Sequence, residues 1–366
     1  MRITNRHSRT RGRNMFSARK KWYRAVIKDL KNNMDMPVWK KLWAYRWGFL
    51  SGKVKLFDLN GDNIGSLISD YDYIKLNPIN GRFVFWIDDK LTTKYILSKY
   101  GDFVPEYYFH LTGAESRCVV KLMDCPEGYS SDTDGVIKLL QDRSSLAVKP
   151  LSGTFGNGFF KLAYRSGGYF INGAESGYEE VCALLESMND HIVTEYVKMH
   201  ESLSEIYAGS LNTLRLVIVN EDGSAPFIGI AGIKFGTSRS GAVDNISAGG
   251  IYCLADVKNG YFNGGFGIDE KNQRVFYENH PDTGRKMEGF IPNWDLVTKG
   301  IFEICRYVPQ LEYMGFDIAV TAEGFKVIEI NSNPGLNRTS NKWNDNLTAY
   351  FSRLLKRMGI KSVNGF

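Results

Sequence analysis

The stretch that decides the fold is GFDIAVTAEGFKVIEIN, at residues 315–331. Two runs that favour strands flank the loop 322–324, whose last residue is a glycine, as three-residue β-hairpin loops require. In the predicted register Thr321 faces Phe325, so Asp317 lies directly opposite Glu329. Like charges that face each other across a strand pair are destabilising. The hairpin therefore needs a partner that neutralises these two carboxylates.

A divalent cation is the partner that the residue types favour. Asn331 lies two residues beyond Glu329 and so on the same sheet face, where its amide offers a neutral oxygen ligand. Mg²⁺ prefers oxygen ligands and is usually held by a few carboxylates together with substrate phosphates. The alternative is that both acids point to solvent at a sheet edge. The metal interpretation predicts phosphoryl chemistry.

A second motif of this kind is LAVKPLSGTFGNGFF, at residues 146–160, which reads as a strand, a glycine-rich loop and another strand. Gly153, Gly156 and Gly158 would let backbone N–H groups approach a polyphosphate, and Lys149 at the strand end would meet a phosphate oxygen. The loop lacks the GxxxxGK[ST] pattern and does not open a helix, which excludes Walker A and Rossmann sites. A plain β-turn remains the alternative.

The composition is that of an ordinary globular protein. The chain has 366 residues, of which 43% are hydrophobic and 23% charged, enough for more than one domain. Its five Cys contain no CxxC pair, which favours a reducing compartment over a disulfide framework or a zinc site. No apolar run approaches the roughly 20 residues of a membrane span, and the N-terminus lacks the apolar core of a signal peptide. We expect a cytoplasmic protein.

Positive charge is concentrated at the N-terminus. Residues 1–53 hold fifteen Lys and Arg against two Asp, a net +13, which leaves −7 for the rest of a chain whose total is +6. Four of the seven Trp also lie there. Three interpretations fit: a solvated basic arm followed by aromatic helices packed on the main body, a membrane-docking segment, or a nucleic-acid surface. No base-reading motif is present, so we expect no specific nucleic-acid partner, and peripheral attachment at the inner face of a membrane is the partner hypothesis.

The remaining pattern predicts an α+β or mixed α/β protein. Helical spacing covers residues 15–48 with a break at Pro37, and Asp88 or Asp89 can cap a helix that reaches Tyr100. Residues 165–168 read as a tight hairpin turn. Further predicted helices cover residues 136–142, 177–188 and 343–358, and strands 146–149, 159–163, 169–172, 192–197, 212–219, 225–235, 315–320 and 325–331.

Several motifs in this order resemble the ATP-grasp superfamily, of which D-alanine–D-alanine ligase is a familiar member. They are the segment that starts at Asp89-Lys90, Val148-Lys149-Pro150 with its glycine loop, Thr194-Glu195-Tyr196-Val197, Asp317, and residues 329–335. Residues 210–215, Asp244-Asn245, Gly249-Gly250 and His280-Pro281 look more narrowly like the sugar-transfer associated ATP-grasp family. The resemblance covers about residues 85–340.

The resemblance implies an ATP-grasp fold, in which two α+β lobes clasp ATP, here preceded by a basic helical extension. The expected domains are 1–53 for the basic, aromatic-rich extension, 54–143 for a region leading into the core, 144–200 for the small ATP-binding lobe, 201–342 for the large lobe with the metal site, and 343–366 for a C-terminal helix.

The resemblance also implies roles for individual residues. Lys90 and Lys149, with Ser152, Gly153, Gly156 and Gly158, would contact the nucleotide phosphates. Glu195, Tyr196 and Val197 would form the hinge that meets adenine, and Glu201 or Glu205 would hold the ribose. Asp317, Glu329 and Asn331 would bind Mg²⁺, with Glu329 bridging two ions.

Lys234 would approach the γ-phosphate. The ligase pattern has an Arg two residues before the metal Asp, where this chain has Gly315, so Arg215 is the candidate to replace it. The alternatives are that Arg215 forms a structural ion pair and that Lys234 lies on a strand surface. His200 and Asn212 would orient the site or serve only local hydrogen bonds.

The family chemistry is the ATP-dependent joining of a carboxylate to an amine through an acyl phosphate. The resemblance implies this reaction during cell-surface polysaccharide assembly, with ATP and Mg²⁺ as cofactors and with an amine and a small-molecule or sugar-linked carboxylate as substrates. The basic segment would bring the enzyme to lipid-linked intermediates at a membrane. A sugar or polyol kinase of the same fold and a non-catalytic nucleotide-binding module remain alternatives.

Overall fold

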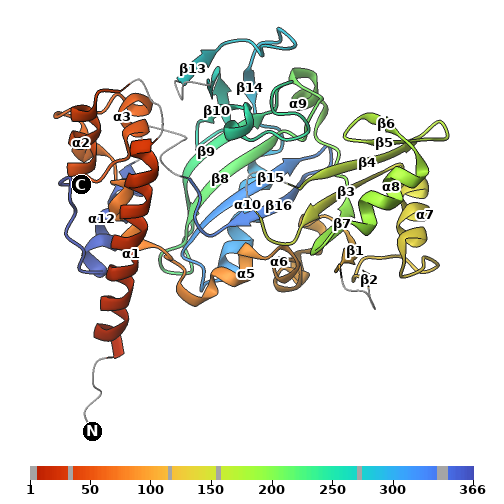
Figure 1. Ribbon diagram of the computed structural model, residues 1–366, viewed down its shortest axis with the longest axis horizontal. Helices are drawn as coiled ribbons and strands as arrows, with labels where there is room; N and C mark the ends of the chain where they lie inside the picture. The colour runs from red at the N-terminus through yellow and green to blue at the C-terminus, as the bar shows by residue number, and fades with distance from the viewer. Residues whose placement is uncertain (1–5, 32–35, 114–117, 154–157, 270–273, 336–344) are drawn as a thin grey trace.

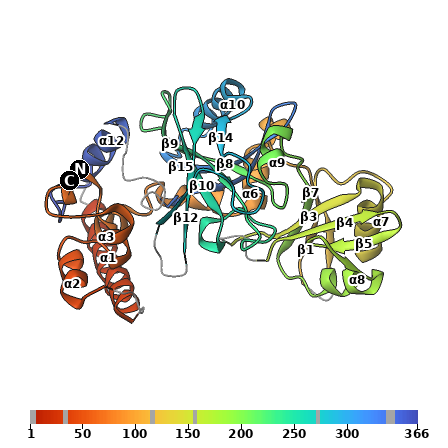
Figure 2. The same cartoon turned by 90° about the horizontal axis from the view of Figure 1, so that it is seen from above.

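The computed structural model describes residues 6–31, 36–113, 118–153, 158–269, 274–335 and 345–366. Figures 1 and 2 show three parts side by side: a group of N-terminal helices together with the last helix, a large central sheet, and a second sheet at the far side. Gly156 of the predicted phosphate loop lies outside the described residues, as do residues 336–344 between the last strand and the last helix.

The described residues form two antiparallel sheets, one of seven strands and one of nine. The first has the strand order β2-β1-β7-β3-β4-β5-β6. Its strands are β1 (Tyr107–Leu111), β2 (Val119–Lys121), β3 (Ser145–Pro150), β4 (Phe160–Arg165), β5 (Gly168–Ile171), β6 (Ala174–Ser176) and β7 (His191–Glu195). Helices α7 (Thr133–Arg143) and α8 (Tyr178–Glu186) contribute buried residues to the core that this sheet forms.

The second sheet runs β13-β12-β10-β9-β8-β15-β16, with β11 and β14 attached beside β10. Its strands are β8 (Thr213–Val219), β9 (Phe227–Phe235), β10 (Ile251–Ala255), β11 (Tyr261–Asn263), β12 (Gly265–Ile268), β13 (Arg274–Tyr277), β14 (Glu288–Phe290), β15 (Tyr313–Val320) and β16 (Phe325–Asn331). The two sheets and their helices confirm the predicted α+β class.

The remaining helices surround these sheets. They are α1 (Arg6–Lys31), α2 (Val38–Arg46), α3 (Ser51–Phe57), α4 (Asp70–Leu76), α5 (Phe85–Asp88), α6 (Lys90–Ile96), α9 (Glu201–Ile206), α10 (Trp294–Tyr307) and α12 (Asp345–Arg357), with short 3-10 helices η1 (Ile64–Ser66), η2 (Gly81–Val84), η3 (Ser98–Phe103) and η4 (Ile246–Ala248). None of the helices described has both the length and the apolar character needed to cross a membrane.

The alternation of side chains along β8 explains how the central sheet is covered on both faces. Leu214, Leu216 and Ile218 pack into the core that includes α10. Val217 and Val219 point the other way and pack with α12. Because successive side chains leave opposite faces of a strand, the residues that precede Val217 on the α12 face are free to form a polar site.

That polar site begins where the apolar cover of α12 ends. Arg215 shares the face of Val217 and pairs in register with Asp317 of β15, which in turn pairs with Glu329 of β16. On the other side Arg215 pairs with Gly232 of β9, so Lys234 lies two residues along the same face. Four neighbouring strands therefore present five charged or amide side chains on one face of the sheet, and the last of them is Asn331.

The tip of the β15–β16 hairpin differs from the predicted register. Val320 pairs with Phe325 and the N–H of Thr321 donates to the carbonyl of Gly324, so the loop has four residues, 321–324, rather than three. A bulge between Asp317 and Ile318 absorbs the difference, and Asp317 still pairs with Glu329. The predicted pairing of the two acids is thus confirmed, whereas the predicted pairing at the tip is wrong by one residue.

Other local predictions had mixed outcomes. Ser166 and Gly167 both have positive φ between paired Arg165 and Gly168, as a two-residue turn with left-handed positions requires. Asp89 caps α6 by accepting from the N–H of Thr92, but this helix ends at Ile96 and a 3-10 helix follows, so the prediction of one helix to Tyr100 is wrong. The strands β10 to β14 were not predicted, because strands of three to five residues show too little alternation. Helix α10 was also not predicted.

The N-terminal helices and the C-terminal tail are joined by hydrogen bonds. The side-chain amide of Asn364 donates to the carbonyls of Ile64 and Leu67, and the carboxylate of Asp72 accepts from Ser362 and Val363. The two ends of the chain therefore build one unit against the central sheet (Figure 1).

The four N-terminal Trp divide into packed and exposed side chains. The ring of Trp22 lies 5.4 Å from that of Tyr71 on α4, and Trp43 and Trp47 pack against the buried cluster of this helical unit. Trp39 is 65% exposed. Packing of aromatic helices on the body thus explains three of these Trp and leaves Trp39 on the surface.

Candidate active site

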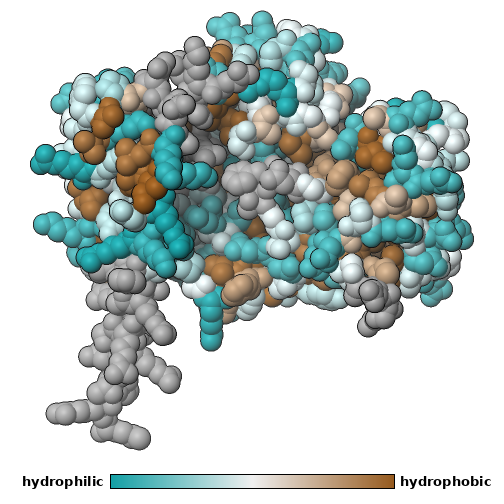
Figure 3. Space-filling view, in the orientation of Figure 1, coloured by the Kyte–Doolittle hydropathy of each residue, from teal (hydrophilic) through white to brown (hydrophobic). Residues whose placement is uncertain are grey.

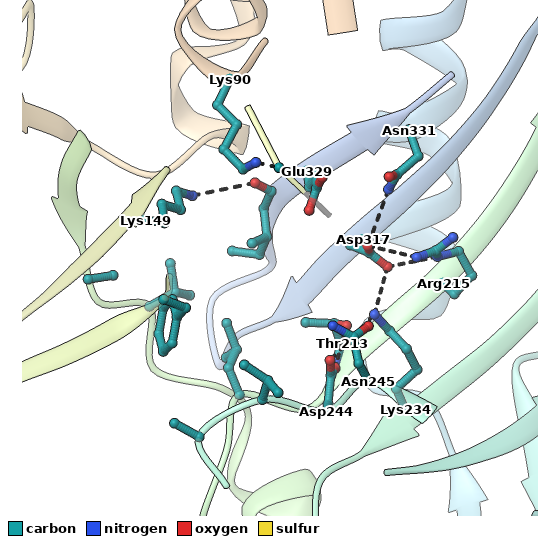
Figure 4. A pocket seen from close by; sticks show the side chains of 18 of the residues that line it. Lys90, Lys149, Thr213, Arg215, Lys234, Asp244, Asn245, Asp317, Glu329 and Asn331 are labelled. Atoms are coloured by element: carbon teal, nitrogen blue, oxygen red, sulfur yellow. Dashed lines mark hydrogen bonds and ion pairs between the residues drawn. The ribbon is translucent and has the colours of Figure 1, made fainter. Parts of the chain in front are cut away.

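A cavity of 460 Å³ lies between the two sheets. Strands β3 and β7 contribute one wall, strands β8, β9, β15 and β16 the other, and α6 reaches in with one lysine. Eleven predicted site residues line it: Lys90, Lys149, Gly153, Glu195, Tyr196, Val197, Arg215, Lys234, Asp317, Glu329 and Asn331. Figure 4 shows the charged members facing one another from the two sides.

At one end of the cavity, which we call the Asp317 end, each charge has a close partner. The guanidinium of Arg215 donates from Nε and Nη2 to the two carboxylate oxygens of Asp317, both at 2.8 Å. The ammonium of Lys234 lies 3.0 Å from Oδ1 of Asp317, and the amide of Asn331 donates to Oδ2 at 3.4 Å. Burial raises the pKa of Asp317, but Arg215 and Lys234 outweigh it and lower the pKa to about 2.

These contacts show how the charges of Asp317 and Glu329 are compensated in the fold. The expected compensation was a divalent cation alone, whereas protein cations already neutralise both acids. Asp317 has Arg215 and Lys234, and Glu329 lies 3.7 Å from the ammonium of Lys90. The interpretation of Arg215 as an ion-pair residue is therefore correct, and its place in the cavity wall leaves a second role open. Lys234 is buried, so a position on an exposed strand surface is excluded.

At the other end, the Lys149 end, positive charge is only partly matched. Lys149 and Lys90 are both more than nine-tenths buried, and Glu329 is the carboxylate near them. The ammonium of Lys149 donates to the carbonyl of Ile328 at 3.5 Å and lies 5.5 Å from the ring centre of Tyr107. Burial and the nearby charge of Lys90 lower the pKa of Lys149 to about 7. The Lys149 end therefore favours the binding of an anion.

The carboxylates fit a hard divalent cation. No group of three or more His, Cys, Asp and Glu that could hold a metal ion occurs among the described residues. Asp317, Glu329 and Asn331 offer two carboxylates and one amide on one sheet face, the donor set of Mg²⁺ when phosphates complete its coordination. The low pKa of Asp317 keeps that carboxylate ionised at neutral pH. The residues present fit Mg²⁺ bound together with a nucleotide.

The segment after β7 connects the two sheets and lines the cavity. Strand β7 ends at Glu195, so the predicted strand 192–197 is too long, and Tyr196 and Val197 lie in the connection that follows. A carboxylate oxygen of Glu195 accepts from the N–H of Glu106 at 3.2 Å. The ammonium of Lys161 lies 4.1 Å from the ring centre of Tyr196. These contacts hold the segment against the first sheet.

The described residues of the glycine-rich loop follow β3 and precede β4, as expected. Gly153 lines the cavity, whereas Ser152 and Gly158 do not. Gly158 has φ +77°, and a Cβ there would lie 3.3 Å from Nε2 of His191. A left-handed conformation in a crowded position explains the glycine at residue 158 without a ligand.

Four other candidate residues lie outside the cavity wall. Glu201 and Glu205 are exposed on α9, and neither lines the cavity, so the choice of a ribose ligand remains a prediction. His200 caps α9 by accepting from the N–H of Ser202. Asn212 is fully buried and donates to the carbonyls of Leu203 and Tyr207. His200 and Asn212 thus have local hydrogen-bonding roles, one of the two alternatives that their sequence left open.

The structure adds residues to the site that the sequence analysis did not assign to it. Asp244, Asn245 and Ser247 line the cavity from the connection between β9 and β10, and Thr213 lines it from the start of β8. Asp244 lies 3.4 Å from the ammonium of Lys234. Asp244-Asn245 is one of the family-like motifs in the sequence, and that was the signal that could have placed it in the site.

Gly315 explains how Arg215 reaches its position. A Cβ at Gly315 would lie 2.5 Å from Cβ of Pro334 and 3.5 Å from Nη1 of Arg215. Any side chain at residue 315 would displace Pro334, which also lines the cavity. The guanidinium of Arg215 therefore lies beside the residue that carries an arginine in the ligase pattern.

Comparison with family models places this site in a known group. Residues 70–344 match the sugar-transfer associated ATP-grasp family. The chain belongs to this family. The family match covers the cavity and both of its walls, and it confirms the resemblance and the ATP-grasp fold expected from the motifs. A comparison with curated proteins found no match.

Solved structures of ATP-grasp ligases are also similar to this member of the family. D-alanyl-alanine synthetase A from Vibrio cholerae O1 biovar eltor str. N16961 is 12% identical, with 76% of this chain and 66% of that chain covered and a TM-score of 0.42. The ligase PsnB, complexed with minimal precursor, Mg and ADP, is 13% identical, with 76% and 61% covered and a TM-score of 0.38. The chain thus spans 66% and 61% of the length of these two proteins.

Proposed function

We propose that this protein is an ATP-dependent carboxylate–amine ligase. The observation that carries the proposal is the pairing of two differently charged ends in one cavity. The Asp317 end offers oxygen ligands with Arg215 and Lys234 beside them, and the Lys149 end offers two buried lysines. A triphosphate that spans the two ends satisfies both, since its phosphates neutralise the lysines and complete a metal site at the carboxylates.

Most of the predicted residues that line the cavity then have a specific task. Lys90 and Lys149 bind phosphate oxygens, and Glu195, Tyr196 and Val197 border the adenine. Asp317, Glu329 and Asn331 hold Mg²⁺, which neutralises charge that develops on the transferred phosphoryl group. Lys234 contacts the γ-phosphate. Arg215 binds the acceptor carboxylate or the acyl phosphate, because its guanidinium borders the cavity beside the metal ligands.

The reaction proceeds in two transfers. A carboxylate oxygen attacks the γ-phosphorus, and the bond from that phosphorus to the β-phosphate oxygen breaks, which releases ADP and leaves an acyl phosphate. The amine nitrogen then attacks the acyl carbon, the carbon–oxygen bond to phosphate breaks, and the amine proton goes to phosphate or water. Positioning and charge neutralisation supply the catalysis, so no nucleophilic side chain is required.

Product analysis tests this proposal against its alternatives. The protein is incubated with Mg²⁺, ATP, a panel of sugar acids and a panel of amino acids and amines. We expect ADP and phosphate in equal amounts only when both partners are present, together with an amide. A phosphate ester without free phosphate would indicate a kinase instead. Nucleotide binding without ADP release across the panels would favour a non-catalytic module.

We also propose that the substrates belong to cell-surface polysaccharide assembly. The description of the family as sugar-transfer associated supports this context. The carboxylate would be a sugar acid or a sugar-linked acid, and the amine an amino acid or an amino sugar. Glycosyltransferase genes beside the gene of this protein would support the context, and their absence across related genomes would argue against it.

Membrane attachment through the basic segment is the third part of the proposal. Helix α1 exposes Tyr23, Ile27 and Leu30, at helical spacing along one face, and α2 exposes Trp39 and Leu42. Figure 3 shows hydrophobic side chains grouped with hydrophilic ones over this part of the molecule. Apolar side chains with cations around them are typical of helices that lie in a membrane interface.

Charge favours an anionic bilayer as the partner of this surface. Six basic residues of the described part of α1 are exposed: Arg19, Lys20, Lys21, Arg24, Lys28 and Lys31. The acid within residues 17–31, Asp29, is buried and accepts from Tyr45 and the N–H of Ser51. Each Lys or Arg near an anionic membrane surface contributes about 1 kcal/mol to binding. Because the acid of this segment is buried, exposed negative charge does not offset that contribution here.

Vesicle co-sedimentation tests the attachment. The full chain should pellet with vesicles that contain phosphatidylserine, less so in high salt and not with neutral vesicles. Changing Trp39 and Leu42 to Ser should reduce the bound fraction, because apolar insertion is lost. The matched control changes Phe276 and Phe290, which are 73% and 63% exposed elsewhere, and should leave binding unchanged. Equal binding by all three proteins, or sedimentation without vesicles as expected of self-association, would overturn the proposal.

A further inference from the structure

The ammonium of Lys234 lies between two carboxylates. It is 3.0 Å from Oδ1 of Asp317 and 3.4 Å from Oδ1 of Asp244. The side chains of Lys234, Asp317 and Asp244 have only 8%, 11% and 9% of their surface exposed. Figure 4 shows Lys234 reaching from β9 toward Asp317 with Asp244 on its other side.

Asp244 is itself held in a fixed orientation. Its Oδ2 accepts from the backbone N–H of Thr213 at 2.8 Å and from the hydroxyl of Thr213 at 2.6 Å. These two bonds leave Oδ1 directed at Lys234. Because Thr213 starts β8, the orientation of Asp244 is set by the same strand that carries Arg215.

The charges at this end balance before any metal ion arrives. Two carboxylates, Asp244 and Asp317, face two cations, Lys234 and Arg215. Oδ1 of Asp317 receives both the Nε of Arg215 and the ammonium of Lys234. A cation that binds Oδ1 of Asp317 therefore competes with Lys234 for that atom.

We propose that Asp244 is a positioning residue that retains Lys234 in the cavity when a divalent cation occupies Asp317. The proposal rests on the metal site of the proposed function and adds a residue outside the predicted site. Lys234 moves fully onto Asp244 as the metal binds, so it stays beside the phosphate that the metal also contacts. Without Asp244, the lysine has only Asp317, and its competition with the metal becomes stronger.

A brace for the connection between β9 and β10 is the competing role for Asp244. In that role its contact with Thr213 matters and its contact with Lys234 does not. Asp244→Asn separates the two, because an amide oxygen can still accept from the N–H of Thr213 but carries no charge toward Lys234. If Asp244 acts through Lys234, the effect of Asp244→Asn on metal affinity must depend on whether Lys234 is present.

The test is a double-mutant cycle read by metal binding. Mn²⁺ binding to the full chain, saturated with a non-hydrolysable ATP analogue, is measured by electron paramagnetic resonance. We expect Asp244→Asn to weaken Mn²⁺ binding about tenfold, which is within the coupling range of neighbouring charges. Lys234→Met should strengthen binding, because a competitor for Asp317 is removed. Asp244→Asn made in the Lys234→Met background should change binding less than about twofold.

Each outcome of the cycle supports or overturns the proposal. An equal loss of affinity from Asp244→Asn with and without Lys234 would assign Asp244 a structural role. If Asp244→Asn unfolds, Thr213→Val removes one of the two anchors of Asp244 and should weaken Mn²⁺ binding partly, again only when Lys234 is present. Failure of the unaltered protein to bind Mn²⁺ with nucleotide would refute the metal site itself, which distinguishes the two failures.

Discussion

The two ends of the cavity differ in how their charges are satisfied by the protein. At the Asp317 end, a carboxylate and two cations lie 2.8 to 3.0 Å apart. At the Lys149 end, the nearest ion pair is the 3.7 Å contact between Lys90 and Glu329, and Lys149 reaches a backbone carbonyl. The first end is organised without a ligand, whereas the second places two lysines close together, an unfavourable arrangement that the proposed polyphosphate would relieve.

From this difference we expect some of these residues to stabilise the fold and others to act only in binding the proposed nucleotide and metal ion. Asp317 is shared by both tasks, because its removal leaves two buried cations beside each other. Glu329 has 27% of its side chain exposed and pairs at a longer distance.

Loss of turnover should be the largest effect, and both carboxylates should show it. Glu329→Gln keeps the shape of the side chain but removes the negative charge of a proposed metal ligand. ATP-dependent turnover should therefore fall below detection while the circular dichroism spectrum is unchanged. Added Mg²⁺ and ATP should raise the melting temperature of the unaltered protein through binding linkage and raise that of the variant much less. Glu323→Gln, exposed at the hairpin tip, is the control. Near-normal turnover with an undiminished Mg²⁺ response in Glu329→Gln would refute the metal site.

Stability should distinguish the two carboxylates without any ligand. Asp317→Asn leaves Arg215 and Lys234 without their shared anion, and breaking a buried pair in this way costs about 3–5 kcal/mol of unfolding free energy. Glu329→Gln should cost at most about 1 kcal/mol, since its pair is longer and partly exposed. A gain in stability from relief of repulsion is not expected, because Lys90 lies beside Glu329. Urea unfolding measures both, and equal losses would remove the contrast between the ends.

The same carboxylate predicts how stability responds to acid. The pKa of Asp317 falls from its ordinary value of 3.8 to about 2, so this group stabilises the fold when the pH lies above the ordinary value. That contribution, roughly 2 kcal/mol, is lost as the pH falls through the folded-state pKa. Between about pH 5 and about pH 2, the free energy of unfolding should therefore fall less in Asp317→Asn than in the unaltered protein.

Nucleotide affinity should depend mainly on the Lys149 end. Lys149→Ala removes a buried cation that faces the phosphates, and hydrogen bonds to charged groups contribute about 1.5–3 kcal/mol, so ATP binding should weaken about 10- to 100-fold. Isothermal titration calorimetry measures the change. Lys138→Ala, on the exposed side of α7, is the matched control. Unchanged affinity in a folded Lys149→Ala protein would remove Lys149 from the phosphate site.

The smallest predicted effect is the pH dependence of that affinity. Lys149 has a pKa of about 7 without ligand, so below this pH it is already charged, and above it ATP binding must be accompanied by proton uptake. The affinity should therefore decrease as the pH rises above that value, by up to about tenfold per pH unit. Lys149→Arg stays charged throughout and should show a flatter profile. Parallel profiles for the two proteins would assign the pH dependence to another group.

The sequence was sufficient to predict the family, the α+β class and most of the charged groups that line the cavity. Lys149 and Glu195 lie at strand ends, and Asp317 and Glu329 lie on one sheet face. Short motifs are enough to predict these positions, because side-chain alternation sets them whenever the strands form. The opposition of Asp317 and Glu329 followed from one hairpin. The bulge beside Asp317 did not, because a bulge depends on how a strand fits its neighbours on both sides.

Which charges neutralise one another depends on the tertiary structure. Arg215 and Asp317 are 102 residues apart in the chain, and Lys90 comes to Glu329 from a helix that precedes both sheets. No local pattern encodes such pairs, because ion pairs depend on distances that the packing of whole sheets sets. For the same reason the sequence suggested a metal ion as the sole partner of two opposed acids, where folding brings Arg215, Lys234 and Lys90 within 4 Å of them.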